Sequence, residues 1–187
     1  CVSISVGYIT INNSRGIYTD NYKDSQKKIF DQVNDDIYNF HSEIVKVIDS
    51  VNSHRAFRSY FTEKDLPVKD LSKNIYELKK QMKSSMDSNN YDMSVLVVGL
   101  NGRSYLNSSE LLTMGVEEIL NLDITKNALK NNKTITYKYL EKGITSSTKN
   151  EPIIIISKAL NLKDEKPYGV INFIIKEKTF QKFYDYF

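Results

Sequence analysis

The residues from Asn21 to His54 include neither proline nor glycine, and the apolar ones among them recur at alternating steps of three and four. On an α-helix this spacing gathers them on one narrow stripe, as at the a and d positions of a coiled coil. The residues between them are mostly polar or charged and face water. We therefore predict a long helix whose stripe packs either against a second copy of the chain or against the chain's own sheet and second helix. The stripe, called the seam below, comprises Phe30, Val33, Ile37, Phe40, Ile44, Val47 and Val51.

A connector and a second helix are expected next. Residues 55–67 break the helical spacing and end at a proline, which predicts a connector held in place by aromatic side chains. From Val68 to Met82 the spacing of three and four returns. Two amphipathic helices are thus predicted ahead of any strand.

The first strands are predicted around a glycine turn. Residues 94–100 form a short apolar run, and Asn101 and Gly102 follow it. This dipeptide favours a two-residue hairpin turn, in which both residues must adopt φ > 0. Residues 103–107 are therefore the expected returning strand.

A helical segment and three more strands complete the predicted domain. The helical segment covers 111–120, and Asp123 or Thr125 caps a short turn of helix that follows it to about Leu129. The strands cover 134–139, 152–159 and 169–175. The last two strands do not alternate cleanly between apolar and polar residues, which predicts that both are central and covered on both faces. A final helix over 176–187 should lead away from the sheet. The fold class is thus α+β, with an antiparallel sheet, a long N-terminal helix and a helical insert.

Charge and cysteine content argue against several kinds of function. The chain has 187 residues, with 26 basic and 23 acidic ones, and its net charge of +3 is too small and too evenly spread for a nucleic-acid surface. The single cysteine, Cys1, allows neither an internal disulfide nor a cysteine cluster for a metal. We expect no cofactor, no metal and no nucleic-acid partner.

The N-terminus has two readings. Residues 1–11 carry no charge and are mostly apolar, but a bilayer crossing takes about 20 residues. They are either the outer end of a membrane helix or the end of an ordinary strand or helix. Cys1 also permits a lipid-modified N-terminus, although the apolar residues after it would be an unusual tether. We divide the chain into a membrane-proximal segment, 1–20, a two-helix region, 21–90, and a sheet with its exit helix, 91–187.

The sequence offers little for catalysis. His41 and His54 stand in no metal-ligand or nucleophile motif, and no phosphate-binding loop or hydrolase signature is present. The carboxylate pair Asp35 and Asp36 falls at solvent-facing positions of the long helix, where the charges are expected to be hydrated. We expect that this domain is not an enzyme.

The order of elements resembles the Cache superfamily, the PAS-like extracellular sensors of bacterial histidine kinases, diguanylate cyclases and chemoreceptors. Three stretches carry the resemblance. Residues 95–105 look like the family's first hairpin, residues 153–159 like its penultimate strand, and residues 168–172 like its Gly-Val final strand. The likeness spans roughly residues 22–187 and is a pattern of elements rather than a signature motif.

The resemblance implies a function. It implies an extracytoplasmic domain of a transmembrane receptor, anchored in the cell membrane through flanking segments, which binds a small molecule and passes the signal through its helices. The chain holds one β-rich unit, so it is either a single Cache domain or the membrane-distal half of a double one. The alternatives are a protein-binding or structural extracellular domain and an intracellular PAS- or GAF-like module.

The ligand is open. Amino-acid-binding double Cache domains carry an Arg beside a Trp-Tyr pair, and this chain has no Trp, so an amino-acid ligand lacks support from the motif.

A PAS-like fold implies a pocket between the sheet and its cover, lined by apolar groups and a few polar ones. Ser157 and Asn172 are polar residues within apolar strands and are the best internal anchors. The alternative is that they only satisfy backbone groups and that the tyrosines belong to the core. The predicted ligand-binding set is Arg103, Tyr105, Tyr137, Tyr139, Ser157 and Asn172.

Overall fold

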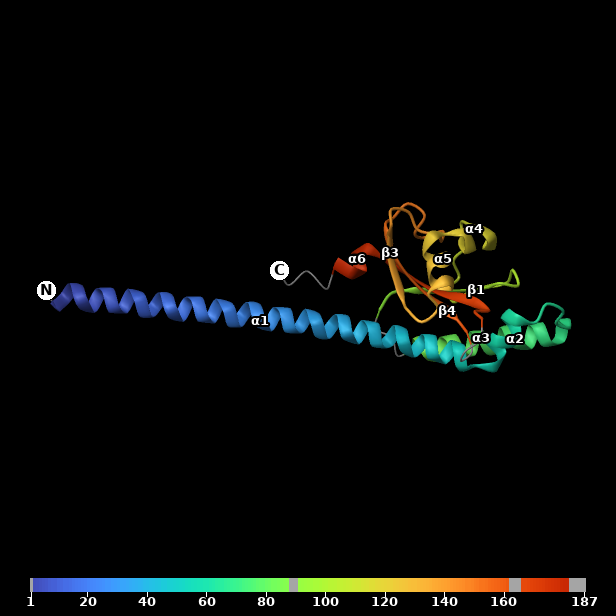
Figure 1. Cartoon of the computed structure of the whole chain (residues 1–187), viewed down its shortest axis with the longest axis horizontal. Coiled ribbons are helices and arrows are strands. Elements are labelled where there is room, and N and C mark those ends of the chain that lie inside the picture. The colour runs from blue at the N-terminus through green and yellow to red at the C-terminus, as the bar shows by residue number, and fades with distance from the viewer. Residues whose placement is uncertain (1, 88–90, 162–165, 182–187) are drawn as a thin grey trace. The chain divides into compact units, whose positions relative to one another are not determined.

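A computed structural model of the chain describes residues 2–87, 91–161 and 166–181, with side chains from position 23 onward (Figure 1). The chain divides into two compact units. The described part of the first ends at Asn39, and the second runs from Phe40 to Gln181. The second unit contains the sheet and is described first.

Five antiparallel strands form one sheet, in the order β2-β1-β5-β4-β3. Both strands predicted to be central, β4 and β5, have a neighbour on each side. The α+β class with an antiparallel sheet is thereby confirmed. The strands are β1 (Ser94–Gly99), β2 (Ser104–Leu106), β3 (Thr136–Leu140), β4 (Ile153–Leu160) and β5 (Gly169–Lys176).

Helices cover both faces of this sheet (Figure 1). On one face α4 (Val116–Asn121) and α5 (Asp123–Lys130) pack against an apolar cluster, and we call this the α4/α5 face. On the opposite face lie α2 (Arg55–Thr62) and α3 (Val68–Met86), together with the last turns of α1. The buried members of the cluster on the α4/α5 face are Leu96, Val98, Ile119, Ile124, Ile144, Ile153, Ile155 and Ile174.

The long helix predicted from the seam is present, and it is longer than predicted. Helix α1 runs without interruption from Val2 to Ser53, so the backbone of residues 2–11 is helical. No described helix combines the length and the apolar content that a membrane crossing requires.

The seam is used differently along α1. In the second unit its members Phe40, Ile44, Val47 and Val51 are at most 2% exposed. In the first unit Val33 is buried, whereas Phe30 and Ile37 are 59% and 39% exposed. The carboxyl-terminal half of the seam is therefore part of the chain's own core, as one of the two predicted arrangements requires.

The predicted connector over 55–67 is wrong for its first eight residues, which form α2. His54 caps this helix, because its Nδ1 accepts the backbone N–H of Ala56 at 3.3 Å. Phe57 and Phe61 lie one turn apart and are fully buried. Two turns are too short for the apolar period to stand out in the sequence, so packing rather than pattern defines this helix.

The helical segment predicted over 111–120 is correct only for its second half. Helix α4 starts at Val116, and the preceding residues pair with another loop instead. Leu112 bridges Thr145, and the backbone N–H of Thr113 donates to the carbonyl of Ile144 at 2.9 Å. This tertiary pairing outweighs the helical tendency of 111–115.

Helix α6 (Glu177–Gln181) follows β5 directly and forms the start of the predicted exit helix, whose residues 182–187 lie outside the described ranges. Phe180 on α6 meets Phe40 on α1 edge to face, with ring centroids 5.1 Å apart. Tyr91, just before β1, meets the same Phe40 ring at 4.9 Å. The start of the second unit and its end are thus joined by aromatic contacts.

The β1–β2 hairpin is present, but its loop has three residues rather than two. The N–H of Gly102 donates to the carbonyl of Gly99, and the N–H of Gly99 donates to the carbonyl of Arg103. Gly102 has φ of 87°, as a residue that closes a three-residue hairpin loop requires. At Gly99, a Cβ atom would lie 2.7 Å from Cδ1 of Phe61.

The substitution Gly99→Ala should therefore destabilise the domain. Phe61 is fully buried and cannot move away without disturbing α2, so we expect a loss of about 1–3 kcal/mol in the free energy of unfolding. Urea unfolding monitored by circular dichroism measures this loss. Gly115→Ala is the matched control, because its added Cβ would have no neighbour closer than 3.5 Å. Equal stability of the two variants would contradict the close packing of α2 on β1.

Candidate functional site

Two polar side chains are buried in the apolar α4/α5 face of the sheet. Asn172 on β5 pairs in register with Leu96 on one side and with Ser157 on the other. All three side chains therefore point to the same face, which Leu96 places under α4 and α5. The hydroxyl of Ser157 donates to Oδ1 of Asn172 at 2.6 Å, and both residues are 0% exposed. The structure thus brings together two of the six residues predicted to bind ligand.

This buried pair is only partly satisfied. Nδ2 of Asn172 is shielded from solvent and has no hydrogen-bond partner among the described residues. On α5, Thr125 is also 0% exposed, and its hydroxyl oxygen is likewise without a partner. A buried polar atom without a partner costs roughly 1–3 kcal/mol. Such atoms mark places where a bound molecule or an ordered water completes the bonding.

Thr125 was missed by the sequence analysis as a site residue. A threonine near the start of a predicted helix is typical of a cap, and only the structure shows it buried beside Ile124 and Ala128. The three positions lie on the side of α5 that packs on the sheet. A polar residue on the buried stripe of a short helix was the available signal.

The surroundings of the pair are apolar. Ile119 on α4, Ile124 on α5 and Ile155 on β4 are each at most 1% exposed and belong to one cluster. A site of this kind binds a small molecule through its apolar body and orients it through a few hydrogen bonds. Both unsatisfied atoms can take part: the amide Nδ2 donates, and the threonine hydroxyl donates or accepts.

The three tyrosines of the predicted set lie on the other face. Tyr105 pairs with Val97 and meets Phe57 of α2 edge to face at 6.2 Å. The hydroxyl of Tyr137 lies 2.6 Å from Nδ1 of His41 on α1. Tyr139 follows two residues later on the same strand and is 52% exposed. The alternation that grouped Tyr137 with Tyr139 is correct, but the structure does not bring them to Ser157 and Asn172.

Burial raises the pKa of the phenols of Tyr105 and Tyr137. Both groups therefore stay neutral at physiological pH. Tyr105 packs half-buried on Phe57, and Tyr137 is 45% exposed with its hydroxyl on His41, so neither phenol lies beside Ser157 and Asn172.

Arg103 holds the end of α2. Its guanidinium donates to the carbonyls of Tyr60, Glu63 and Lys64 at 2.8, 2.8 and 2.9 Å. It also lies over the Tyr60 ring, 5.3 Å from the centroid. The last carbonyls of a helix have no partner within the helix. Here Arg103 donates to one of them, on Tyr60, which Nδ2 of Asn101 also reaches at 3.0 Å, and to two carbonyls just after the helix. The structure places Arg103 apart from the α4/α5 face, so its contacts are those of a clamp between the hairpin and α2.

Arg103→Gln should lower the free energy of unfolding by about 2 kcal/mol, since it removes charged donors from three carbonyls. The matched control is Lys64→Gln, which removes the same charge from an exposed side chain nearby. Thermal unfolding of both variants tests the clamp. A variant at Arg103 that melts like the control would show that these contacts contribute little.

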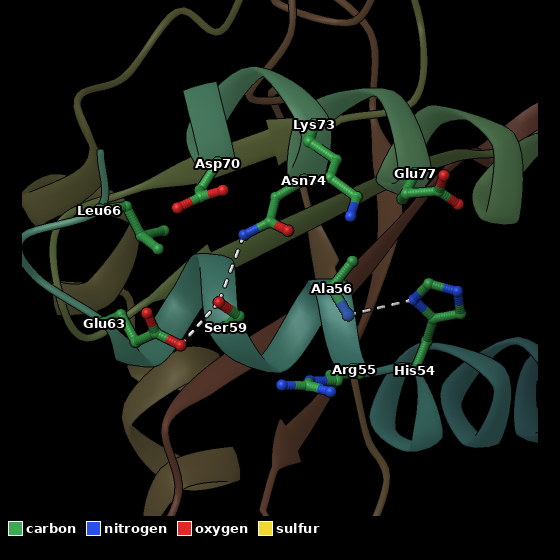
Figure 2. Close-up of a pocket in the computed structure, with 10 residues that line it drawn as sticks. All are labelled: His54, Arg55, Ala56, Ser59, Glu63, Leu66, Asp70, Lys73, Asn74 and Glu77. Atoms are coloured by element: carbon green, nitrogen blue, oxygen red, sulfur yellow. Dashed lines mark hydrogen bonds between the residues drawn. The ribbon is translucent and has the colours of Figure 1, made fainter. Parts of the chain in front are cut away.

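A hollow of about 510 Å³ opens between α2 and α3, away from the buried pair (Figure 2). Nδ2 of Asn74 donates to the hydroxyl of Ser59, which donates to the carboxylate of Glu63. The charged side chains of the hollow form no ion pair with one another in the described part of the chain. Its open, charged lining lacks the apolar enclosure of the α4/α5 face. The charged members are Arg55, Glu63, Asp70, Lys73 and Glu77.

The architecture can be compared with solved structures. The ligand-binding domain of the Campylobacter jejuni chemoreceptor Tlp3, in complex with L-valine, superposes with a TM-score of 0.60 at 20% identity, over 86% of this chain and 60% of that one. The fold is that of a chemoreceptor sensory domain. The ligand-binding domain of the Pseudomonas fluorescens chemoreceptor CtaA, in complex with L-isoleucine, gives a TM-score of 0.53 at 14% identity, over 81% of this chain and 55% of that one.

These likenesses confirm the expected fold, which this chain shares with the ligand-binding domains of chemoreceptors. The chain spans about 60% of the length of the Tlp3 domain. No protein-family model matches the sequence, and no curated protein matches it significantly. Both similar structures are ligand-binding domains of chemoreceptors.

Proposed function

We propose that this chain is the extracytoplasmic ligand-sensing domain of a bacterial transmembrane receptor. The fold supports a sensor, and the α4/α5 face supplies a buried, incompletely bonded polar pair in apolar surroundings. That pair is the observation on which the proposal rests. The domain binds a small molecule, and an output domain outside this chain acts on the signal.

The ligand proposed for this face is a small molecule with an apolar body and at least one hydrogen-bond acceptor. The acceptor meets Nδ2 of Asn172, and the apolar part lies among the isoleucines of the cluster. Tlp3 and CtaA were solved with apolar amino acids, which makes L-valine and L-isoleucine the first compounds to test. Because the pair is fully buried, entry requires the α4/α5 cover to move.

A double variant, Ser157→Ala with Asn172→Leu, tests the site. Removing both partners of a buried hydrogen bond is nearly neutral or stabilising, so the variant should unfold with a free energy within about 1 kcal/mol of the original chain. A ligand that binds only the folded state raises the melting temperature, and the double variant should lose this rise. A thermal-shift screen against small metabolites measures both quantities.

The control for this screen is Asn127→Leu, the same replacement on the exposed side of α5. It should respond to ligand like the original chain. If a ligand found in the screen raised the melting temperature of the double variant equally, the α4/α5 face would not be the site. A screen without any responding compound would favour a protein-binding or structural role.

We further propose that two copies of the chain associate through the exposed part of the seam. Phe30 and Ile37 lie two turns apart on α1, and both are exposed in the single chain. An exposed apolar stripe of this kind is stabilised when it packs against the stripe of a second helix. In the membrane receptor, a shift between the paired helices carries the signal toward the membrane.

Phe30→Glu with Ile37→Glu should therefore convert a dimer into a monomer, because charges on the seam would face each other across the interface. Analytical ultracentrifugation of the full chain measures the change in mass. Asn39→Glu is the matched control, because residue 39 projects from the opposite side of α1 and is exposed. An original chain that sediments as a monomer over the accessible concentration range would rule out strong pairing through the seam.

The division into segments 1–20, 21–90 and 91–187 stays a prediction. So does the membrane anchor in the flanking sequence. The chain is either a single Cache domain or the membrane-distal half of a double one, and this too stays a prediction. The hydropathy of the parent protein on either side of this region decides the anchor: two spanning segments that bracket it fit the receptor.

A further inference from the structure

Helix α2 carries two arginines that have no acidic partner in the part of the chain that the structure describes. Arg55 and Arg58 are three residues apart and thus neighbours on the helix surface. Neither guanidinium forms a hydrogen bond or an ion pair with any residue that the structure describes. The guanidinium of Arg103, by contrast, donates hydrogen bonds to carbonyls at the end of the same helix.

Arg58 is more than a solvated surface charge. Its Nε is shielded from solvent and has no acceptor in the described residues. Its charge acts on Tyr168, whose pKa burial raises to about 12 while Arg58 opposes the rise. The hydroxyl of Tyr168 in turn donates to Oδ1 of Asn52 on α1. The Arg58 cation therefore acts on the buried Tyr168, and an acceptor for its unpaired Nε–H would be strongly stabilising there.

Both arginines line a hollow of about 290 Å³ on α2. The hydroxyl groups that share the lining already donate elsewhere: Ser53 to the carbonyl of Ser50, Ser59 to Glu63, and Thr62 to the carbonyl of Arg58. Among the described side chains of this lining, the donors left for a bound molecule are those of the two guanidinium groups. Each presents N–H groups in a planar fork that matches a carboxylate or a phosphate.

The one carboxylate of the lining is turned toward the next helix. Glu63 accepts from Ser59, which itself accepts from Asn74 on α3. Figure 2 shows this chain of bonds on the α3 side, whereas the guanidinium of Arg55 lies across the α2 ribbon from Asn74. Glu63 lines the hollow with both arginines, but its carboxylate already accepts from Ser59.

We propose that Arg55 and Arg58 form an oxyanion-binding site on α2, for the phosphate or carboxylate group of a small molecule. The site lies on the opposite side of the sheet from Ser157 and Asn172 and does not depend on the ligand bound there. A bound oxyanion accepts from Nε of Arg58 and bridges to Arg55. It thereby stabilises the junction of α1 and α2, next to the contact between Asn52 and Tyr168.

The full chain should bind inorganic phosphate or acetate saturably in a chloride buffer of constant ionic strength, measured by calorimetry and by the shift in melting temperature. The two anions separate the two sources of the shared chemistry: tighter phosphate binding indicates a phosphorylated ligand, and tighter acetate binding a carboxylate. In Arg58→Gln the affinity for the tighter anion should fall roughly tenfold or more, as expected when a charge-assisted bond is lost.

Lys69→Gln is the matched control, since it removes one exposed positive charge from α3 outside the hollow, and it should bind like the original chain. Arg55→Gln changes an exposed side chain, keeps the fold testable if Arg58→Gln unfolds, and should also weaken binding. The Ser157→Ala, Asn172→Leu chain should bind the anion normally, which separates this site from the proposed sensing site. Absence of saturable binding, or equal affinity in the original chain and both arginine variants, overturns the proposal.

Discussion

The fold depends on a strand that is buried on both faces. Seven of the eight residues of β5 are buried, and β1 and β4 pair along both of its edges. Such a strand is stable only if each face of the sheet is covered, and the two layers of helices meet that requirement. Its alternation also separates the chemistry: Asn172 points toward α4 and α5, while Phe173 points toward the layer that contains α2.

This separation organises the candidate sites. The α4/α5 face is apolar with a small, incompletely bonded polar centre, which suits enclosure of a small molecule. The opposite layer is held by polar clamps at helix ends, such as Arg103 on the carbonyls of α2. The buried polar pair and the clamps at the helix ends therefore lie on different sides of one sheet, connected through strands that contribute to both.

The sequence predicts the long-range features best. The seam, the central strands and the polar anchors Ser157 and Asn172 are marked by repeats or by a polar residue in an apolar run. Alternation shows which residues share a face, but it does not say which face, so Tyr137 and Tyr139 could not be placed. The sequence also failed to predict short elements. Helix α2 is too brief to show a period, and residues 111–115 are set by a loop pairing distant in sequence.

The contact between Phe40 and Phe180 has a consequence for engineering. Phe40 opens the second unit and Phe180 stands one residue before its end, yet their rings are 5.1 Å apart. A unit whose ends adjoin can be inserted between two helical segments of another protein without stretching either one. Residues 40–181 thus form a natural cassette for chimeric receptors, in which a foreign output domain would report occupancy of the domain.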